Sequence, residues 1–227
     1  MEAATQLEPT QAGAWAALSH LYLLADNTSE TDVVKAAAKA YEADPFISNA
    51  SKIVERIFYG YYDLDQAVAA AEWCDEGRRR FPDNGVFTMC QLYVMTMRGQ
   101  HPDAARAWLL ANSDAIANDP RGGSTELQKL DARLMVAAVL ARAGLKDSAK
   151  AVAKGGTAGT DVDPARYLYM QQAFALLLAG DKRGSVGALK VFLTANPDQR
   201  KAFAKDPGWR FVDLADNPAF RRLVSAD

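Results

Sequence analysis

Apolar residues recur along this chain at intervals of three and four, the spacing that places side chains on one face of a helix. Two such faces open the chain and are separated by a polar turn over residues 26–31. They are formed by Trp15, Leu18, Ser19 and Tyr22, and then by Val33, Ala37 and Ala40. The pattern predicts two consecutive helices that pack against each other.

Prolines divide the rest of the chain into segments of similar length. They lie at Pro9, Pro45, Pro82, Pro120, Pro164 and Pro197, which leaves gaps of 36, 37, 38, 44 and 33 residues. Proline cannot continue a helix, because it lacks the N–H and its ring clashes with the preceding turn. A period in the thirties is typical of solenoids built from helix pairs. The spacing therefore predicts an all-α fold of about five helix pairs and no sheet.

The first segment resembles the tetratricopeptide repeat family. That family has a bulky residue, a leucine, a small residue and a tyrosine on its first helix, small residues on the second, and a closing proline. These places are held here by Trp15, Leu18, Ser19, Tyr22, Val33, Ala37, Ala40 and Pro45. The fifth segment matches through Tyr169, Gln172, Ala173, Leu176, Ser185, Leu189, Phe192 and Pro197, with Gln172 as the departure. The resemblance implies a right-handed solenoid of helical hairpins.

The expected organisation is a single solenoid over residues 1–227. A partial helix covers 1–9, repeats cover 12–45, 48–82, 84–120, 124–160 and 164–197, and capping helices cover 198–227. The partial helix favours truncation of a longer protein. The aromatic tail, with Trp209 and Phe220, resembles the ends of bacterial tetratricopeptide regions attached to kinases, cyclases and transcriptional regulators.

Glycines and an acid mark several expected helix ends. Gly99, Gly144 and Gly180 fit helix C-termini that need a positive φ, and Gly60 is expected at or near the turn of the second repeat. Asp163-Pro164 is expected to open the fifth repeat, as an acidic N-cap and a proline at the first helical position. The frame of repeats two and three stays open by one residue.

Composition narrows the class of partner. The formal net charge is −2 and the sequence pI is about 5.8, so the chain has no field to attract nucleic acid or an anionic membrane. The sequence contains neither an apolar run of 18 residues nor a basic start followed by an apolar core. A cytoplasmic location without membrane insertion is the expectation.

Residues that carry chemistry are few. The two histidines, His20 and His101, lie in different repeats, and no metal-binding, nucleophile or phosphate-loop motif surrounds them. Cys74 and Cys90 are expected to be buried free thiols, with a disulfide left as an alternative. The sequence therefore predicts no catalytic residues, no metal site and no cofactor, and so no enzyme.

The resemblance places a peptide-binding groove along the first helix of each repeat. The residues carried over to it are His20, Leu23, Arg56, Tyr59, Leu92, Met95, Leu134, Tyr167, Met170 and Phe174. Much of this set is apolar or aromatic, and exposed apolar stripes usually mark binding surfaces. The alternative is that several of them belong to the core and the frame is shifted.

The function expected from this groove is a non-catalytic scaffold that binds a peptide or protein segment, oriented by His20 and Arg56. Two alternatives remain. The chain could self-associate through its uncovered N-terminal end, or it could be the sensor or effector-coupling domain of a larger bacterial regulator.

Overall fold

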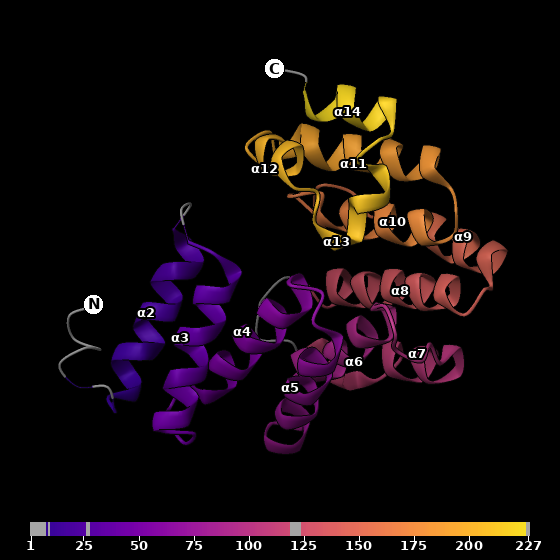
Figure 1. Ribbon diagram of the computed structural model, residues 1–227. Helices are drawn as coiled ribbons and strands as arrows, with labels where there is room; N and C mark the ends of the chain where they lie inside the picture. Colours follow the sequence, from indigo (N-terminus) through magenta and orange to yellow (C-terminus); the bar gives the residue numbers. More distant parts are fainter. Residues whose placement is uncertain (1–7, 9, 26–27, 119–123, 226–227) are drawn as a thin grey trace. The chain divides into compact units, whose positions relative to one another are not determined.

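The computed structural model describes residues 8, 10–25, 28–118 and 124–225, and every regular element over these residues is a helix (Figure 1). The predicted all-α class is confirmed for this part of the chain. The expected helix over 1–9 lies outside the described residues, apart from Glu8. The chain forms two compact units, Met1–Gly99 and Gln100–Asp227, called unit 1 and unit 2 below.

Unit 1 is a series of helices in which each packs against the next. They are α2 (Ala12–Leu24), α3 (Glu30–Ala43), α4 (Ala50–Asp63), α5 (Ala67–Arg80) and α6 (Gly85–Thr96). Short connections join α2 to α3 and α4 to α5, so each of these pairs is a helical hairpin. The helix α4 also contacts α6.

Small residues let the helices of unit 1 approach closely. Ala37 and Ala40 of α3 are fully buried, as their predicted helical face requires, and they pack with Ile53 and Ile57 of α4. Gly60 is buried in the last turn of α4, which ends at Asp63, so it lies near the expected turn but within the helix. A Cβ at this position would lie 2.2 Å from Val34 Cγ2, and glycine is therefore what allows α3 to contact α4 here.

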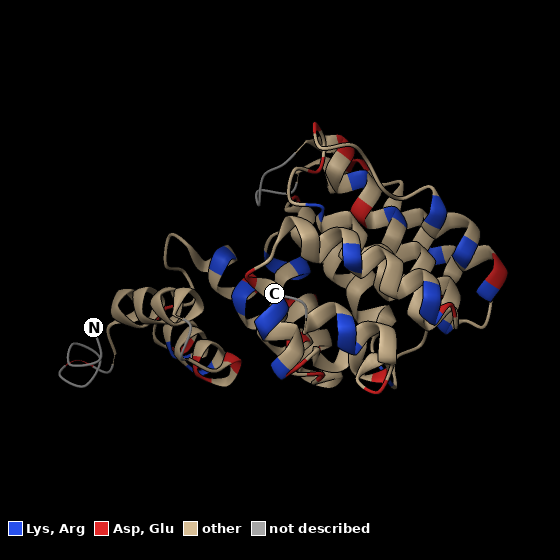
Figure 2. Ribbon diagram, turned by 90° about the horizontal axis from the view of Figure 1, so that it is seen from above, with Lys and Arg blue, Asp and Glu red and all other residues tan. Residues whose placement is uncertain are grey.

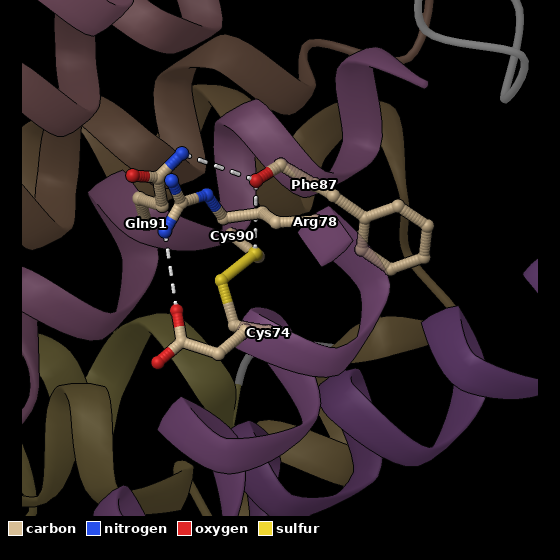
Figure 3. A network of polar contacts seen from close by, with 6 residues as sticks. Cys74, Arg78, Phe87, Cys90 and Gln91 are labelled. Atoms are coloured by element: carbon tan, nitrogen blue, oxygen red, sulfur yellow. Dashed lines mark hydrogen bonds and ion pairs between the residues drawn. A yellow bond between two sulfur atoms is a disulfide. The ribbon is translucent and has the colours of Figure 1, made fainter. Parts of the chain in front are cut away.

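A disulfide joins α5 to α6 (Figure 3). Cys74 and Cys90 pair with their Cα atoms 5.7 Å apart, so the expectation of free thiols is wrong. One turn away on each helix, Gly77 faces the ring of Phe87, and a Cβ at Gly77 would lie 2.1 Å from Cδ1 of that ring. The missing side chain brings the helices close enough for the sulfur atoms to meet.

The basic run 78–80 ends α5, and its third member contacts several neighbouring rings. Arg80 donates to the Tyr41 hydroxyl at 2.6 Å, and its guanidinium lies 5.1–5.3 Å from the ring centres of Tyr41, Phe46 and Phe81. Tyr41 in turn donates to the carboxylate of Glu76. This network ties α3 to α5.

Unit 2 contains the longest described helix and a set of short ones. Its elements are α7 (Ala104–Ala111), η1 (Asp114–Asn118), α8 (Thr125–Arg142), α9 (Lys146–Lys154), α10 (Tyr167–Leu178), α11 (Lys182–Ala195), α12 (Gln199–Lys205), α13 (Gly208–Phe211), η2 (Val212–Leu214) and α14 (Pro218–Val224). The helix α8 packs against α7, α9 and α10, and α10 packs against α11.

The helix ends follow the expected chemistry with one exception. Gly99, Gly144 and Gly180 have φ values of 77°, 81° and 81°, which confirms the prediction of positive φ. The Asp163 carboxylate accepts hydrogen bonds from the N–H groups of Tyr167 and Leu168, both at 2.9 Å. The Asp163 carboxylate thus satisfies the first N–H groups of α10 from outside the helix. The N-cap residue is Arg166 and the helix begins at Tyr167, so the expected places of Asp163 as the N-cap and of Pro164 at the first helical position are both wrong.

The short helices after residue 198 pack against α10 and α11. Phe174 of α10 meets Trp209 and Phe211 edge-on, with ring centres 5.5 and 6.2 Å apart. Phe211, Leu214 and Phe220 are buried. The aromatic tail is thus part of the core of unit 2.

Two consecutive helices fall within each of the five segments expected as repeats. The pairs are α2 and α3, α4 and α5, α6 and α7, α8 and α9, and α10 and α11. The division between the two compact units falls after Gly99, inside the third segment.

Candidate functional site

A cavity of about 330 Å³ opens among α2, α3 and α4 of unit 1. We call it the α2–α4 cavity, and its lining residues are His20, Leu23, Glu30, Val33, Lys52, Glu55, Arg56, Tyr59, Gly60 and Asp63. Four residues of the predicted groove are among them: His20, Leu23, Arg56 and Tyr59. The structure therefore brings these four together around a single hollow.

One stripe of α4 forms the floor of this cavity. Its members follow positions i, i+3, i+4, i+7, i+8 and i+11, and they are Lys52, Glu55, Arg56, Tyr59, Gly60 and Asp63. Such spacing keeps side chains on one helical face. The adjacent face of α4 carries Ile53 and Ile57 into the core, while this stripe borders the cavity.

The walls come from the last turns of α2 and the first turn of α3. His20 and Leu23 lie one turn apart on α2, and Leu23 is 51% exposed. Ser29 caps α3 by accepting from Asp32 N at 3.2 Å, which sets the position where Glu30 begins the helix. The cap and the hairpin thus position both walls.

Arg56 is a half-buried cation held by neutral groups. Its guanidinium donates to the Ala16 carbonyl at 3.3 Å and to the Ser19 hydroxyl, and it lies 3.4 Å from His20 Nδ1. Burial lowers the pKa of Arg56 from its usual value. Among the described residues no carboxylate forms an ion pair with Arg56, and its neighbour Glu55 is paired with Lys52 at 3.1 Å. The neighbouring Glu55 charge opposes this lowering of the Arg56 pKa. Arg56 therefore places a half-buried positive charge, without an ion pair, in the cavity wall.

Glu30 of α3 supplies a negative charge. It lies beside Gly60 of α4, one helical turn beyond Arg56. Its Oε2 would lie 3.8 Å from a Cβ built at Gly60. Loss of surrounding water raises the pKa of Glu30, and the neighbouring Asp63 charge raises this pKa further. Within the described chain no cation forms an ion pair with Glu30, so this end of the cavity is acidic.

Tyr59 lies between the two charges and is held by aromatic neighbours. Its ring meets Phe58 edge-on at 4.8 Å and Tyr93 of α6 edge-on at 5.8 Å. It is half-buried, so it contributes both to the core and to the cavity surface. A rigid ring of this kind gives contact area at low cost in side-chain entropy.

The other six residues of the predicted groove lie elsewhere. Leu92 and Met95 are buried in α6 of unit 1, at 0% and 8% exposure. In unit 2, Leu134 and Phe174 are buried, while Tyr167 and Met170 are half-buried. Leu92, Leu134 and Phe174 occupy core positions in this structure, which is the alternative interpretation raised from the sequence.

Six lining residues were not expected from the sequence: Glu30, Val33, Lys52, Glu55, Gly60 and Asp63. From the α4 stripe, the resemblance carried over only Arg56 and Tyr59, and Gly60 was expected at or near the turn of the second repeat. Glu30 and Asp63 lie at helix ends, where a charge is ordinarily solvated.

The described residues contain no group of three or more His, Cys, Asp or Glu side chains arranged to hold a metal ion. None of the described helices combines the length and apolar character needed to cross a bilayer. Both basic and acidic residues occur along the helices (Figure 2). Comparison with known protein families and with curated protein sequences finds no match.

The cavity thus offers a positive group, an aromatic ring and a negative group in series, with leucine at its edge. This arrangement suits binding by hydrogen bonds and ion pairs with an apolar contact.

Proposed function

We propose that this chain is a non-catalytic, tetratricopeptide-like scaffold that binds an extended segment of a partner protein in the α2–α4 cavity. The observation that carries the proposal is that four residues expected in a peptide groove, His20, Leu23, Arg56 and Tyr59, line one cavity. Four packed helix pairs, α2 with α3, α4 with α5, α8 with α9 and α10 with α11, support the proposed right-handed solenoid of repeats.

The cavity has the composition of a peptide site. Leu23 gives an exposed apolar contact, Tyr59 a rigid aromatic one, and Arg56 a cation already oriented by Ser19 and Ala16. Aromatic and arginine side chains are enriched among residues that dominate binding energy. A guanidinium held in place loses little entropy when a ligand arrives.

The test is selection of binders from a random twelve-residue peptide library on the immobilised protein, followed by titration of the selected peptides. Leu23→Glu should weaken their binding by about tenfold or more, because it places a charge at the apolar edge of the cavity. Leu24→Glu is the matched control, since Leu24 is 68% exposed on the same helix and does not line the cavity.

If Leu23→Glu and Leu24→Glu bind the selected peptides equally well, the site lies outside this cavity. If no peptide is selected at all, peptide binding itself is excluded as the function. Circular dichroism of both variants should match the wild type, which separates lost binding from lost folding.

Self-association is the second candidate, and the surface of α2 favours it. Leu21 and Leu24 lie one turn apart and are 47% and 68% exposed. Sedimentation equilibrium over a range of concentrations measures it directly. A dimer that dissociates in Leu24→Glu but persists in Leu23→Glu would favour this candidate over the peptide site.

A further inference from the structure

We propose that the segment bound by the α2–α4 cavity is an extended peptide with an acidic and a basic side chain two residues apart. The acidic side chain pairs with Arg56, and the basic side chain enters between Glu30 and Asp63. This inference rests on the proposed function and specifies the chemistry of its partner.

The first step is that two of the charged residues lining the cavity, Arg56 and Glu30, form no ion pair within the described chain. Arg56 makes its hydrogen bonds to Ala16 O and Ser19 Oγ, which carry no charge, and it lies beside His20. Glu30 meets Asp63, a charge of the same sign. A carboxylate near Arg56 and a cation near Glu30 would both relieve unfavourable electrostatics that the protein bears alone.

The second step is the distance between the charges. Glu30 lies over Gly60, four residues from Arg56 on α4. At a rise of about 1.5 Å per residue this corresponds to roughly 6 Å along the helix axis. In an extended peptide, side chains at i and i+2 point the same way and are about 6.6–6.8 Å apart. An acidic and a basic residue two positions apart therefore match the two ends of the cavity.

The third step excludes a free amino acid bound through its own α-ammonium and α-carboxylate. These two groups are separated by one Cα atom, and one residue spans at most about 3.3–3.6 Å of backbone. They cannot reach both charged ends at once. The residue between the acid and the base of a longer segment would face away from α4, toward the exposed Leu23 at the edge.

The experiment uses acetylated and amidated nine-residue peptides, so that their termini carry no charge. The central sequences are Glu-Leu-Lys, Gln-Leu-Lys, Glu-Leu-Gln and Gln-Leu-Gln in a common Gly-Ser frame. Titration calorimetry with the full chain should show Glu-Leu-Lys binding about tenfold more tightly than Gln-Leu-Gln, as expected for two partly exposed charge pairs. The advantage should shrink as salt is raised.

Two variants assign each charge to its end of the cavity. Glu30→Gln should remove the preference for lysine over glutamine in the peptide and keep the preference for glutamate. Arg56→Gln should do the reverse. Glu72→Gln and Arg98→Gln are the matched controls, since both residues are exposed in unit 1 and neither lines the cavity. If Arg56→Gln does not fold, the Glu30→Gln arm decides alone.

Equal affinity of the wild type for Glu-Leu-Lys and Gln-Leu-Gln would overturn the inference. If library-selected peptides still bind in a manner that depends on Leu23, the proposed function survives that result and only the charge pattern fails. If the lysine preference persists in Glu30→Gln, the basic side chain does not bind at Glu30 and the assignment is wrong.

Discussion

Different contacts stabilise the interior of each of the two compact units. In unit 1, a disulfide joins α5 to α6, and the network of Tyr41, Glu76 and Arg80 joins α3 to α5. In unit 2, the residues after 198 fold back and place Phe211, Leu214 and Phe220 against the last helix pair. Unit 1 adds specific cross-links to its apolar core, whereas unit 2 adds further apolar burial.

The two units also differ in where the predicted groove residues lie. In unit 1, four of them line the α2–α4 cavity. In unit 2, a cavity of about 480 Å³ between α7 and α8 contains none of them, and Phe174 is covered by Trp209 and Phe211. The proposed site therefore lies in unit 1.

The largest effect is expected from Phe211→Ala in unit 2. This ring is 1% exposed and contacts Phe174 and Phe203, so its removal leaves a cavity in the core. We expect a loss of about 3–5 kcal/mol in the free energy of unfolding. Urea denaturation measures it, with Val212→Ala as the control, because Val212 is 46% exposed. Equal losses in both variants would mean that the tail is not part of the core.

Reduction of the disulfide tests unit 1. Cys74 and Cys90 are 16 residues apart, and a loop of that length contributes about 3 kcal/mol in the chain-entropy description. Hydrogen exchange with and without a dithiol reductant should show faster exchange in α5 and α6. Unit 2 contains no cysteine and is the internal control. Exchange that rises equally in both units would contradict separate means of stabilisation.

The same pair of cysteines bears on the compartment. Stable disulfides are uncommon in reducing cytosol and typical of oxidising compartments. The expectation of a cytoplasmic location, drawn from the lack of a leader-like start, did not take a disulfide into account. Free thiols can be alkylated in protein isolated from its native source and detected by mass spectrometry. Alkylated cysteines would indicate a reducing compartment, and unmodified ones an oxidising compartment.

A smaller effect is expected from Ala40→Leu, which tests the close approach of helices in unit 1. Ala40 is fully buried against α4, so three added carbons have no space. We expect a loss of about 1–3 kcal/mol from overpacking. Ala43→Leu is the control, since Ala43 is exposed on the same helix. A change of a few tenths in Ala40→Leu would show that α3 and α4 are not in close contact.

Helix pairs were predictable because their signals are local. Apolar spacing, the periodic prolines and the turn glycines Gly99, Gly144 and Gly180 each act within a few residues. The role of Gly60 was not predictable, because a glycine that permits helix contact and one that ends a helix look alike in sequence. The packing of α3 distinguishes them, because a Cβ at Gly60 would lie 2.2 Å from Val34 Cγ2.

The site was predictable in part. His20, Leu23, Arg56 and Tyr59 followed from the resemblance to a repeat family, which specifies positions on first helices. Glu30 did not, because its place beside Gly60 depends on how α3 packs across α4. The disulfide likewise depends on the distance between α5 and α6 and not on the spacing of the two cysteines.

The smallest expected effect is a pH dependence in unit 1, below about 1 kcal/mol because the charges are partly exposed to solvent. Glu30 has a pKa raised above its usual value near 4.5, by burial and then by Asp63. The native state therefore binds this proton more readily than the unfolded state. Between 4.5 and the raised native pKa, the contribution of Glu30 to stability falls as pH rises.

The pKa of Glu76 is shifted in the opposite direction from that of Glu30. The hydrogen bond from Tyr41, and then that from Arg79, lower the pKa of Glu76. Its stabilising contribution is present above the unfolded pKa near 4.5 and is lost as pH falls through the lowered native value. On raising the pH from 4 to 7, urea midpoints of Glu30→Gln should rise relative to wild type, and those of Glu76→Gln should fall. Glu72→Gln should follow the wild type. If the urea midpoints of all three variants change with pH in parallel, the Glu30 carboxylate is fully hydrated. A basic ligand would then have no unfavourable electrostatics to relieve at the acidic end of the cavity.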